Sequence, residues 1–154
     1  MILRNKFLLI SIVFLSCSSN LKKETSFYIR SNGGVTISGG EPTLQYNFLV
    51  KLLEALKKEN YNVVLETSGI LQWNKMEPLT KLVDIFYLDI KDIDRELHKR
   101  NTGTGNSIIL ANAENLAKKN IKVIYRIPVV PGFNYGSDEV LLLDRFLTKV
   151  KATE

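Results

Sequence analysis

A glycine-rich turn is the part of the sequence best suited to hold a small ligand. Gly39 and Gly40 follow the β-branched run 35–38 and precede Glu41. Residues without a Cβ let the backbone come close to a bound molecule, and the Glu41 carboxylate can receive a cationic amine. The alternative is a tight surface turn with an exposed acid, and the motifs that follow along the chain favour a ligand site.

Charged residues follow two later apolar segments. Asp89 and Lys91 flank Ile90 directly after the run 85–88, so that an acid and a base stand close together. Arg126 lies in a mostly apolar run, where an unpaired guanidinium would be costly to bury. We therefore expect Arg126 to meet an acid or a ligand carboxylate.

Hydroxyl groups occur at the end of a third apolar segment. Thr67 and Ser68 precede Gly69, and both offer donors to a ligand. Such residues also make local hydrogen bonds where a strand turns into a helix. Both interpretations stay open at this point.

The elements that must position these residues alternate between strand and helix patterns. Short apolar runs predict strands at 35–38, 63–67, 85–89 and 122–127. Amphipathic spacing predicts helices at 46–58, 76–83, 95–99, 107–119 and 137–150.

Local signals mark several helix ends. Pro78 is tolerable in the segment 76–83 because it would lie in the first turn. Ser107 is a candidate cap of the helix that follows it. Asn120 is a candidate left-handed stop of the same helix.

Apolar strands that alternate with amphipathic helices predict an α/β fold with a parallel sheet and helical crossovers. Every ligand-binding candidate above stands at the end of a predicted strand. The carboxyl ends of parallel strands meet at one edge of the sheet, where such folds bind ligands. The sequence therefore predicts a single site at that edge.

Five motifs occur in a fixed order between residues 26 and 150. They are Gly39-Gly40-Glu41-Pro42, Glu66-Thr67-Ser68-Gly69, Leu88-Asp89-Ile90-Lys91, the pattern Asp94-x3-His98-x3-Thr102-Gly103-x2-Asn106, and Arg126-Ile127-Pro128. A glycine-rich turn alone would be weak evidence. Together, the motifs resemble the radical SAM superfamily, and within it the glycyl-radical-enzyme activating enzymes such as the one that serves pyruvate formate-lyase.

The resemblance implies a partial (β/α) barrel of the radical SAM type with about four parallel βα units. The predicted elements contain no counterpart of the first barrel strand, with its cluster-binding loop, or of the last part of the barrel. We therefore expect the strand 35–38 to expose an unpaired edge.

The resemblance also implies that the chain binds S-adenosyl-L-methionine. The cofactor-binding residues that it assigns are Gly39, Gly40, Glu41, Thr67, Asp89, Ile90, Lys91 and Arg126. In the family, an electron from a [4Fe–4S] cluster cleaves this cofactor, and the resulting 5′-deoxyadenosyl radical removes hydrogen from a glycine of a partner. The implied partner is a glycyl-radical enzyme.

Ligands for the family's iron–sulfur cluster are scarce in this sequence. The family binds the cluster with a Cys-x3-Cys-x2-Cys loop, because such clusters require thiolates. The 154 residues contain one cysteine, Cys17, and one histidine, His98, which is expected to pack or face solvent. We therefore predict no catalytic and no metal-binding residue, and a truncated, inactive member of the family.

Composition and charge are those of a globular domain. Hydrophobic residues make up 45% of the chain, and its net charge is +5. Lysine pairs such as Lys57-Lys58 and Lys118-Lys119 fall where predicted helices meet water, and no aromatic residues interleave them. We expect solvated helix ends and no nucleic-acid binding.

The first 23 residues differ from the rest. The apolar run 7–15 has the length of a signal-peptide core and is too short to span a bilayer. Cys17 follows it, as in a bacterial lipoprotein signal. The run also fits a buried strand or helix, or unrelated sequence. We divide the chain into a signal-like or replaced segment, 1–23, and a partial radical SAM domain, 24–154.

Two functional hypotheses follow. In the first, the chain is a family member in the cytoplasm, where thiols and iron–sulfur clusters stay reduced. In the second, it is an exported α/β binding module that is anchored to a membrane through a lipid on Cys17 and has no radical chemistry. The family resemblance favours the cytoplasm, and a membrane is expected only if the signal is real.

Overall fold

The computed structural model describes residues 7–11, 33–130, 134 and 136–152. Its strands are β1 (Phe7–Ser11), β2 (Gly34–Ser38), β3 (Asn62–Thr67), β4 (Ile85–Asp89) and β5 (Val123–Arg126). Its helices are the 3-10 helix η1 (Pro42–Gln45) and the α-helices α2 (Tyr46–Lys58), α3 (Trp73–Leu79), α4 (Arg95–Thr102), α5 (Ser107–Lys118) and α6 (Ser137–Lys149).

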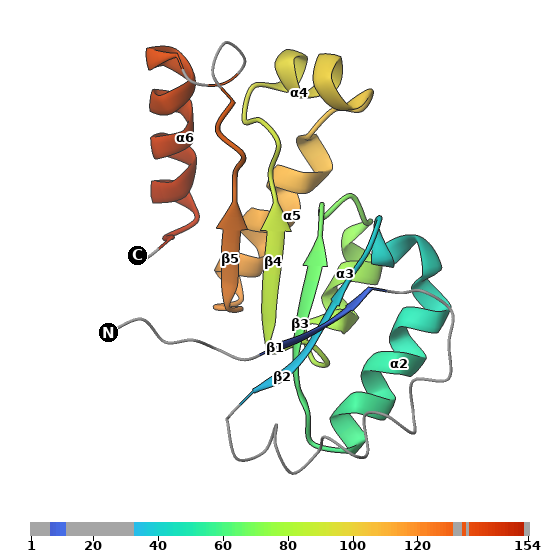
Figure 1. Ribbon diagram of the computed structural model, residues 1–154. Coiled ribbons are helices and arrows are strands. Elements are labelled where there is room, and N and C mark those ends of the chain that lie inside the picture. Colours follow the sequence, from blue (N-terminus) through green and yellow to red (C-terminus); the bar gives the residue numbers. More distant parts are fainter. Residues whose placement is uncertain (1–6, 12–32, 131–133, 135, 153–154) are drawn as a thin grey trace.

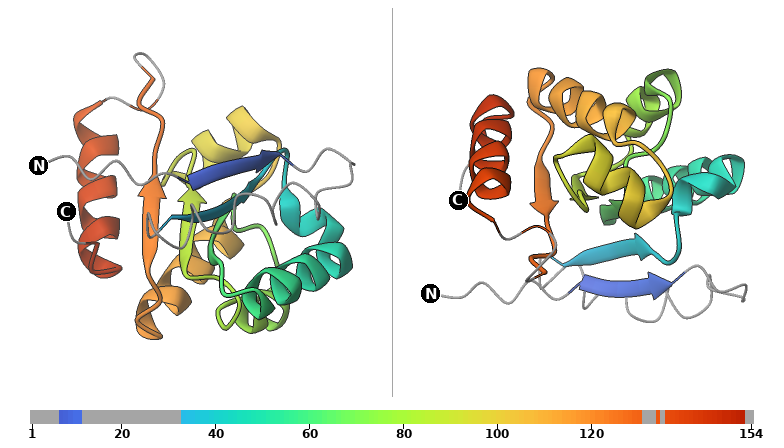
Figure 2. Two further views of the ribbon diagram at one scale, coloured as in Figure 1. Left: turned by 60° about the horizontal axis from the view of Figure 1, so that its bottom comes forward. Right: turned by 90° about the horizontal axis from the view of Figure 1, so that it is seen from above.

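The five strands form one parallel sheet in the order β1-β2-β3-β4-β5. Helices α2, α3, α5 and α6 lie around the outer side of this curved sheet, and α4 lies beyond the carboxyl ends of the strands (Figures 1 and 2). Each helical connection returns the chain to the start of the next strand, so the carboxyl ends of all strands meet at one edge. The predicted α/β partial barrel is confirmed.

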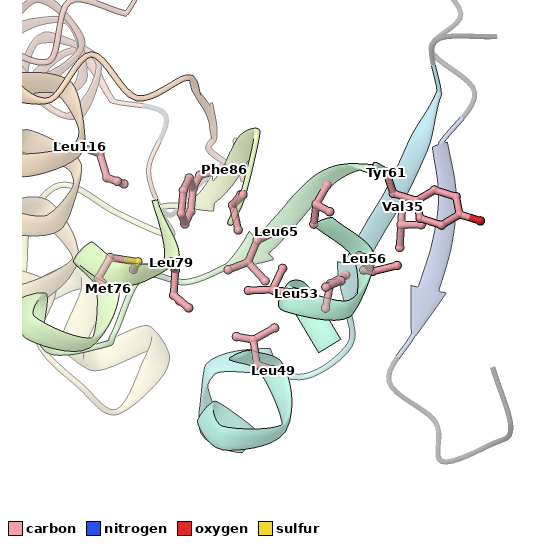
Figure 3. Packing of buried hydrophobic residues seen from close by; sticks show 13 residues of the cluster. Val35, Leu49, Leu53, Leu56, Tyr61, Leu65, Met76, Leu79, Phe86 and Leu116 are labelled. Atoms are coloured by element: carbon pink, nitrogen blue, oxygen red, sulfur yellow. The ribbon is translucent and has the colours of Figure 1, made fainter. Parts of the chain in front are cut away.

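The hydrophobic core lies between the sheet and its helices. Leu49, Leu53 and Leu56 of α2 are buried at three-and-four spacing and belong to one cluster with Val35 and Leu65 of the sheet (Figure 3). Successive residues of a strand point to opposite faces. Because alternate strand residues are committed to this core, the residues between them face the inside of the curve.

The helix predicted at 76–83 is α3, Trp73–Leu79, and α4 runs on to Thr102, beyond the predicted end at 99. Two signals at helix ends also differ from the prediction. Pro78 lies in the last turn of α3 rather than the first. It is tolerated because the helix is ending there, and the chain continues through tighter bonds such as Thr80 N–H to Glu77 O at 3.1 Å. Ser107 is the first residue of α5 rather than its cap, because Asn106 occupies the cap position. Asn120 has a φ of 54°, which confirms the left-handed stop.

The apolar run near the start contributes a strand. β1 pairs in parallel with β2, from Phe7 opposite Gly34 to Ser11 opposite Ser38. The expectation that the strand 35–38 exposes an unpaired edge is therefore wrong, and the outer strands of the sheet are β1 and β5. The proposed boundary between residues 23 and 24 lies outside the described residues and stays a prediction. Among the residues described, no helix is long and apolar enough to cross a membrane.

Candidate functional site

Two groups of polar side chains lie at the carboxyl edge of the sheet. We call the first the turn cluster, and it consists of Glu41, Thr43, Thr67 and Ser68. The second is the charge cluster, and it consists of Glu66, Asp89, Lys91 and Arg126. The end of β3 belongs to both, because Glu66, Thr67 and Ser68 are consecutive residues.

Glu41 is the centre of the turn cluster. Its Oε1 accepts hydrogen bonds from Thr43 N–H at 3.1 Å, Thr43 Oγ1 at 2.6 Å and Thr67 Oγ1 at 2.7 Å. Its Oε2 accepts from Ser68 N–H at 2.8 Å and Ser68 Oγ at 2.5 Å. The carboxylate thus joins the turn after β2 to the end of β3.

The donors around Glu41 determine its ionisation. Burial alone would raise the pKa of Glu41, but the hydrogen bonds from Ser68, Thr43 and Thr67 outweigh burial and hold this pKa below its ordinary value. Glu41 is therefore an anion that protein donors already solvate. It acts as a support for the glycine turn rather than as a free acceptor for an amine.

The glycine turn itself is open to solvent. Gly39 and Gly40 are exposed, with φ angles of 107° and 48°. A Cβ on Gly40 would meet nothing within 4 Å. Glycine is favoured at position 40 by its positive φ and not by a lack of space. With no side chain there, the backbone of the turn is accessible to a ligand.

Arg126 is the centre of the charge cluster. The register places it opposite Asp89, and its Nε donates to Asp89 Oδ1 at 2.6 Å. Its terminal nitrogen donates to Glu66 Oε1 on β3, the strand on the far side of β4, and its guanidinium carbon lies 5.5 Å from the centre of the Tyr87 ring. Lys91 Nζ lies 3.3 Å from Asp89 Oδ2. The expectation that Arg126 meets an acid is confirmed.

The ion pairs of this cluster favour the charged forms of Asp89 and Arg126. Burial opposes the charge of Asp89, but Arg126 and Lys91 hold the pKa of its carboxyl below the ordinary value. The hydrogen bond with Asp89 raises the pKa of Arg126 further. The side chains keep exposures from 21% for Asp89 to 47% for Lys91. Two acids and two bases thus form a neutral surface that a ligand can reach.

The structure divides the eight predicted cofactor-binding residues into two groups. Gly39, Gly40, Asp89, Lys91 and Arg126 reach the surface of the carboxyl edge. Glu41 and Thr67 are engaged with each other, and Thr67 is only 3% exposed, with its Oγ1 also accepting from Gly69 N–H at 3.0 Å. Ile90 is fully buried. The side chains of these three residues are thus engaged or enclosed, and the Ile90 N–H donates to Arg126 O at 3.0 Å.

Several contacts at this edge involve residues that sequence reasoning left without a role. Glu66 pairs with Arg126. Asn112 of α5 is 2% exposed, and its Nδ2 donates to Gly69 O at 2.8 Å and Leu71 O at 2.6 Å. The signal available in the sequence was a polar residue beside Ala113 on the apolar face of a helix.

His98 has a structural position. It is 2% exposed, and its Nδ1 lies 2.9 Å from Thr104 O. The Asp94 carboxylate caps α4 through Leu97 N–H at 2.8 Å. Of the two positions expected for His98, packed or facing solvent, the structure has the packed one.

The donor set does not fit an iron–sulfur cluster. Within the described part of the chain, no group of three or more His, Cys, Asp or Glu side chains is placed to hold a metal ion. Cys17 lies outside that part, and the sequence holds no second cysteine. Since such clusters are held by several thiolates, we assign no cluster ligands and derive no step through this group.

Replacing Glu41 by Gln should lower stability at neutral pH by about 1–3 kcal/mol, because an amide cannot accept all the bonds that the carboxylate accepts. The pKa of Glu41 is lowered in the folded state, so its contribution is present above its unfolded pKa and is lost as the pH falls through the folded pKa. Urea unfolding of both proteins should therefore show the difference shrinking below about pH 4.5. Glu54→Gln, on the exposed side of α2, is the control, and an equal loss in that variant would contradict the expectation.

Comparisons with known proteins agree with the motifs. The family model of the Radical SAM superfamily matches residues 20–143. A (2S)-3-sulfopropanediol dehydratase activating enzyme from Klebsiella oxytoca is 40% identical over 118 residues, which cover 77% of this chain and 37% of that protein. A 4-hydroxyphenylacetate decarboxylase activating enzyme from Clostridioides difficile (strain CD196) is 40% identical over 122 residues, which cover 78% of this chain and 39% of that protein. The chain thus spans roughly two fifths of the length of these relatives.

Solved structures show the same fold. A domain of pyruvate-formate lyase-activating enzyme from Bacteroides vulgatus ATCC 8482 has a TM-score of 0.70 and 26% identity, over 75% of this chain and 71% of that chain. Streptococcus suis SuiB bound to S-adenosylmethionine has a TM-score of 0.65 at 19% identity, over 94% of this chain and 36% of that chain, and shares the fold. On its motifs, its family match and its fold, this chain belongs to the radical SAM superfamily, and the curated relatives described above are activating enzymes.

Proposed function

We propose that this chain binds S-adenosyl-L-methionine at the carboxyl edge of its sheet, as part of a protein that activates a glycyl-radical enzyme. The observation that carries the proposal is the junction of the two clusters at the end of β3. There the bare turn at Gly39 and Gly40 and the accessible pair of Asp89 and Lys91 are held by two sets of hydrogen bonds, which end on the neighbouring residues Ser68 and Glu66.

Each accessible group has a distinct role in this proposal. Lys91 is the most exposed member of the charge cluster and has a single ion pair at 3.3 Å, so it can turn to meet the carboxylate of the ligand. Asp89 and Glu66 offer acceptors for hydroxyl or amine groups. Arg126 holds both acids in place, and the glycine turn lets ligand atoms approach the backbone.

The radical step itself is not assigned to these residues. In this family, the bound cluster supplies the electron that cleaves the cofactor, and its thiolate ligands are lacking from the 154 residues. What the described side chains can do is bind and orient the cofactor. The proposed partner of the whole protein is a glycyl-radical enzyme, and we propose no nucleic-acid partner.

We further propose that the protein resides in the cytoplasm rather than on a membrane through Cys17. The pairing of Phe7–Ser11 with β2 supports this, because cleavage before Cys17 would remove β1 from the sheet. Mass spectrometry of the native N-terminus should find peptides that contain residues 7–11. A mature chain that starts at a lipidated Cys17 would support the exported module instead.

Binding of S-adenosyl-L-methionine to the full chain should be weak, with a Kd of about 1 mM or about −4 kcal/mol, because the iron that anchors the cofactor in the family has no ligands here. Chemical-shift titration can measure this range. Lys91→Ala should weaken binding about threefold to tenfold, since it removes the accessible cation at this edge. Lys58→Ala removes the same charge from the exposed end of α2 and should leave the Kd unchanged. Equal effects of the two substitutions would place the site elsewhere.

The purified chain should not hold a stoichiometric [4Fe–4S] cluster after anaerobic reconstitution with iron and sulfide, because Cys17 is its single thiol. Iron and acid-labile sulfide analysis gives the result directly. A full cluster that persists in Cys17→Ser would overturn this expectation.

A further inference from the structure

The turn that follows β3 runs through residues 67–71 and has little freedom of path. Gly69 has a φ of 75°, which disfavours any residue with a side chain. A Cβ at this position would also lie 2.6 Å from Leu88 Cδ1, a fully buried atom group of β4. The turn therefore lies against the core side chains Leu88 of β4 and Ile109 of α5.

The two sides of this turn are held by two different residues. On one side, Glu41 accepts from Thr67 Oγ1, Ser68 N–H and Ser68 Oγ. On the other side, Asn112 Nδ2 donates to Gly69 O at 2.8 Å and to Leu71 O at 2.6 Å. The Glu41 carboxylate thus accepts hydrogen bonds from Thr67 and Ser68, and the Asn112 amide donates to two carbonyls of the turn.

The side-chain amide of Asn112 is buried among apolar residues of α5. It is 2% exposed on α5, with Ile109, Ala113 and Leu116 buried on the same helix. A buried amide is unfavourable unless its hydrogen bonds are made. Both bonds of Asn112 go to the turn, across more than forty residues of sequence, so the amide specifies where the turn lies relative to α5.

We propose that Asn112 is a positioning residue for the cofactor site. It donates to the carbonyls of Gly69 and Leu71. It thereby keeps the hydrogen bonds between Ser68 and Glu41 in place and fixes the end of β3, where Glu66 belongs to the charge cluster. The inference rests on the proposed S-adenosyl-L-methionine site at this edge. Without the amide, the buried carbonyl of Gly69 and the partly buried carbonyl of Leu71 lose their donor, and the turn has to move to bring Gly69 O to solvent, which withdraws Ser68 from Glu41.

Amide hydrogen exchange of the full chain, followed by NMR, tests the structural half of the inference. Asn112→Ala should speed exchange at Ser68 and Gly69 about tenfold or more relative to the rest of the sheet. Leu116→Ala is the matched control, because it removes a fully buried side chain one turn further along α5 without a bond to the turn. It should speed exchange across the core without selecting these two amides. Asn112→Asp keeps the volume, removes the donor, and should repeat the selective pattern.

Titration with S-adenosyl-L-methionine tests the functional half. Asn112→Ala should raise the Kd about tenfold, and Leu116→Ala should leave it within about twofold under conditions where both variants are folded. Combining Asn112→Ala with Glu41→Gln should cost less than the sum of the two, because both residues hold the same turn.

The outcomes separate the two proposals. If the wild-type chain does not bind the cofactor, the proposed function fails, and selective exchange at Ser68 and Gly69 would still support control of the turn by Asn112. If neither Asn112 variant exchanges faster at these amides than Leu116→Ala does, the positioning role is wrong. Selective exchange with an unchanged Kd would also overturn it.

Discussion

The Glu41 carboxylate is the interaction on which the carboxyl edge of this protein depends. It accepts three hydrogen bonds on Oε1 and two on Oε2, and these bonds come from the turn after β2 and from the end of β3. A neutral side chain could not satisfy the same donors, because hydrogen bonds to a charged acceptor are the stronger ones. The charge therefore fixes the junction of two strand ends, and the glycine turn and the residues of the charge cluster are placed relative to that junction.

The charge cluster also joins strand ends, but through a cation rather than a carboxylate. Arg126 bridges acids on two neighbouring strands, Asp89 of β4 and Glu66 of β3. A guanidinium presents several donors in a planar fork, so it can serve both carboxylates at once, whereas a lysine would offer a point charge to one of them. Because the four side chains sum to zero charge, the charge cluster presents groups of both signs without a net charge. Such a surface suits a ligand that itself carries both an amine and a carboxylate.

Much of this arrangement follows from sequence periodicity. The four strands between residues 34 and 126 were predictable from short apolar runs, and their parallel order then brings Asp89 and Arg126 to one edge. The need of Arg126 for an acid followed from the cost of burying a charge. Thr67 was harder, because its place on the helix side of the sheet depends on which alternate residues β3 commits to the core. A strand was one of the alternatives open for the run 7–15, but its pairing with β2 and the bonds of Asn112 were out of reach, since the partners lie far along the chain.

The residues that hold the carboxyl edge in place differ from the residues that a ligand could contact there. Glu41 and Asn112 hold the β3 end through side chains that point into the protein, and neither of these contacts involves a cluster ligand. The accessible groups, Asp89 and Lys91, are ordered by Arg126. Every element of the edge is therefore preorganised by contacts within the described fold. Preorganisation lowers the cost of binding but does not replace a metal bond to the ligand, so under the proposed function this edge selects the cofactor by charge and shape and binds it weakly.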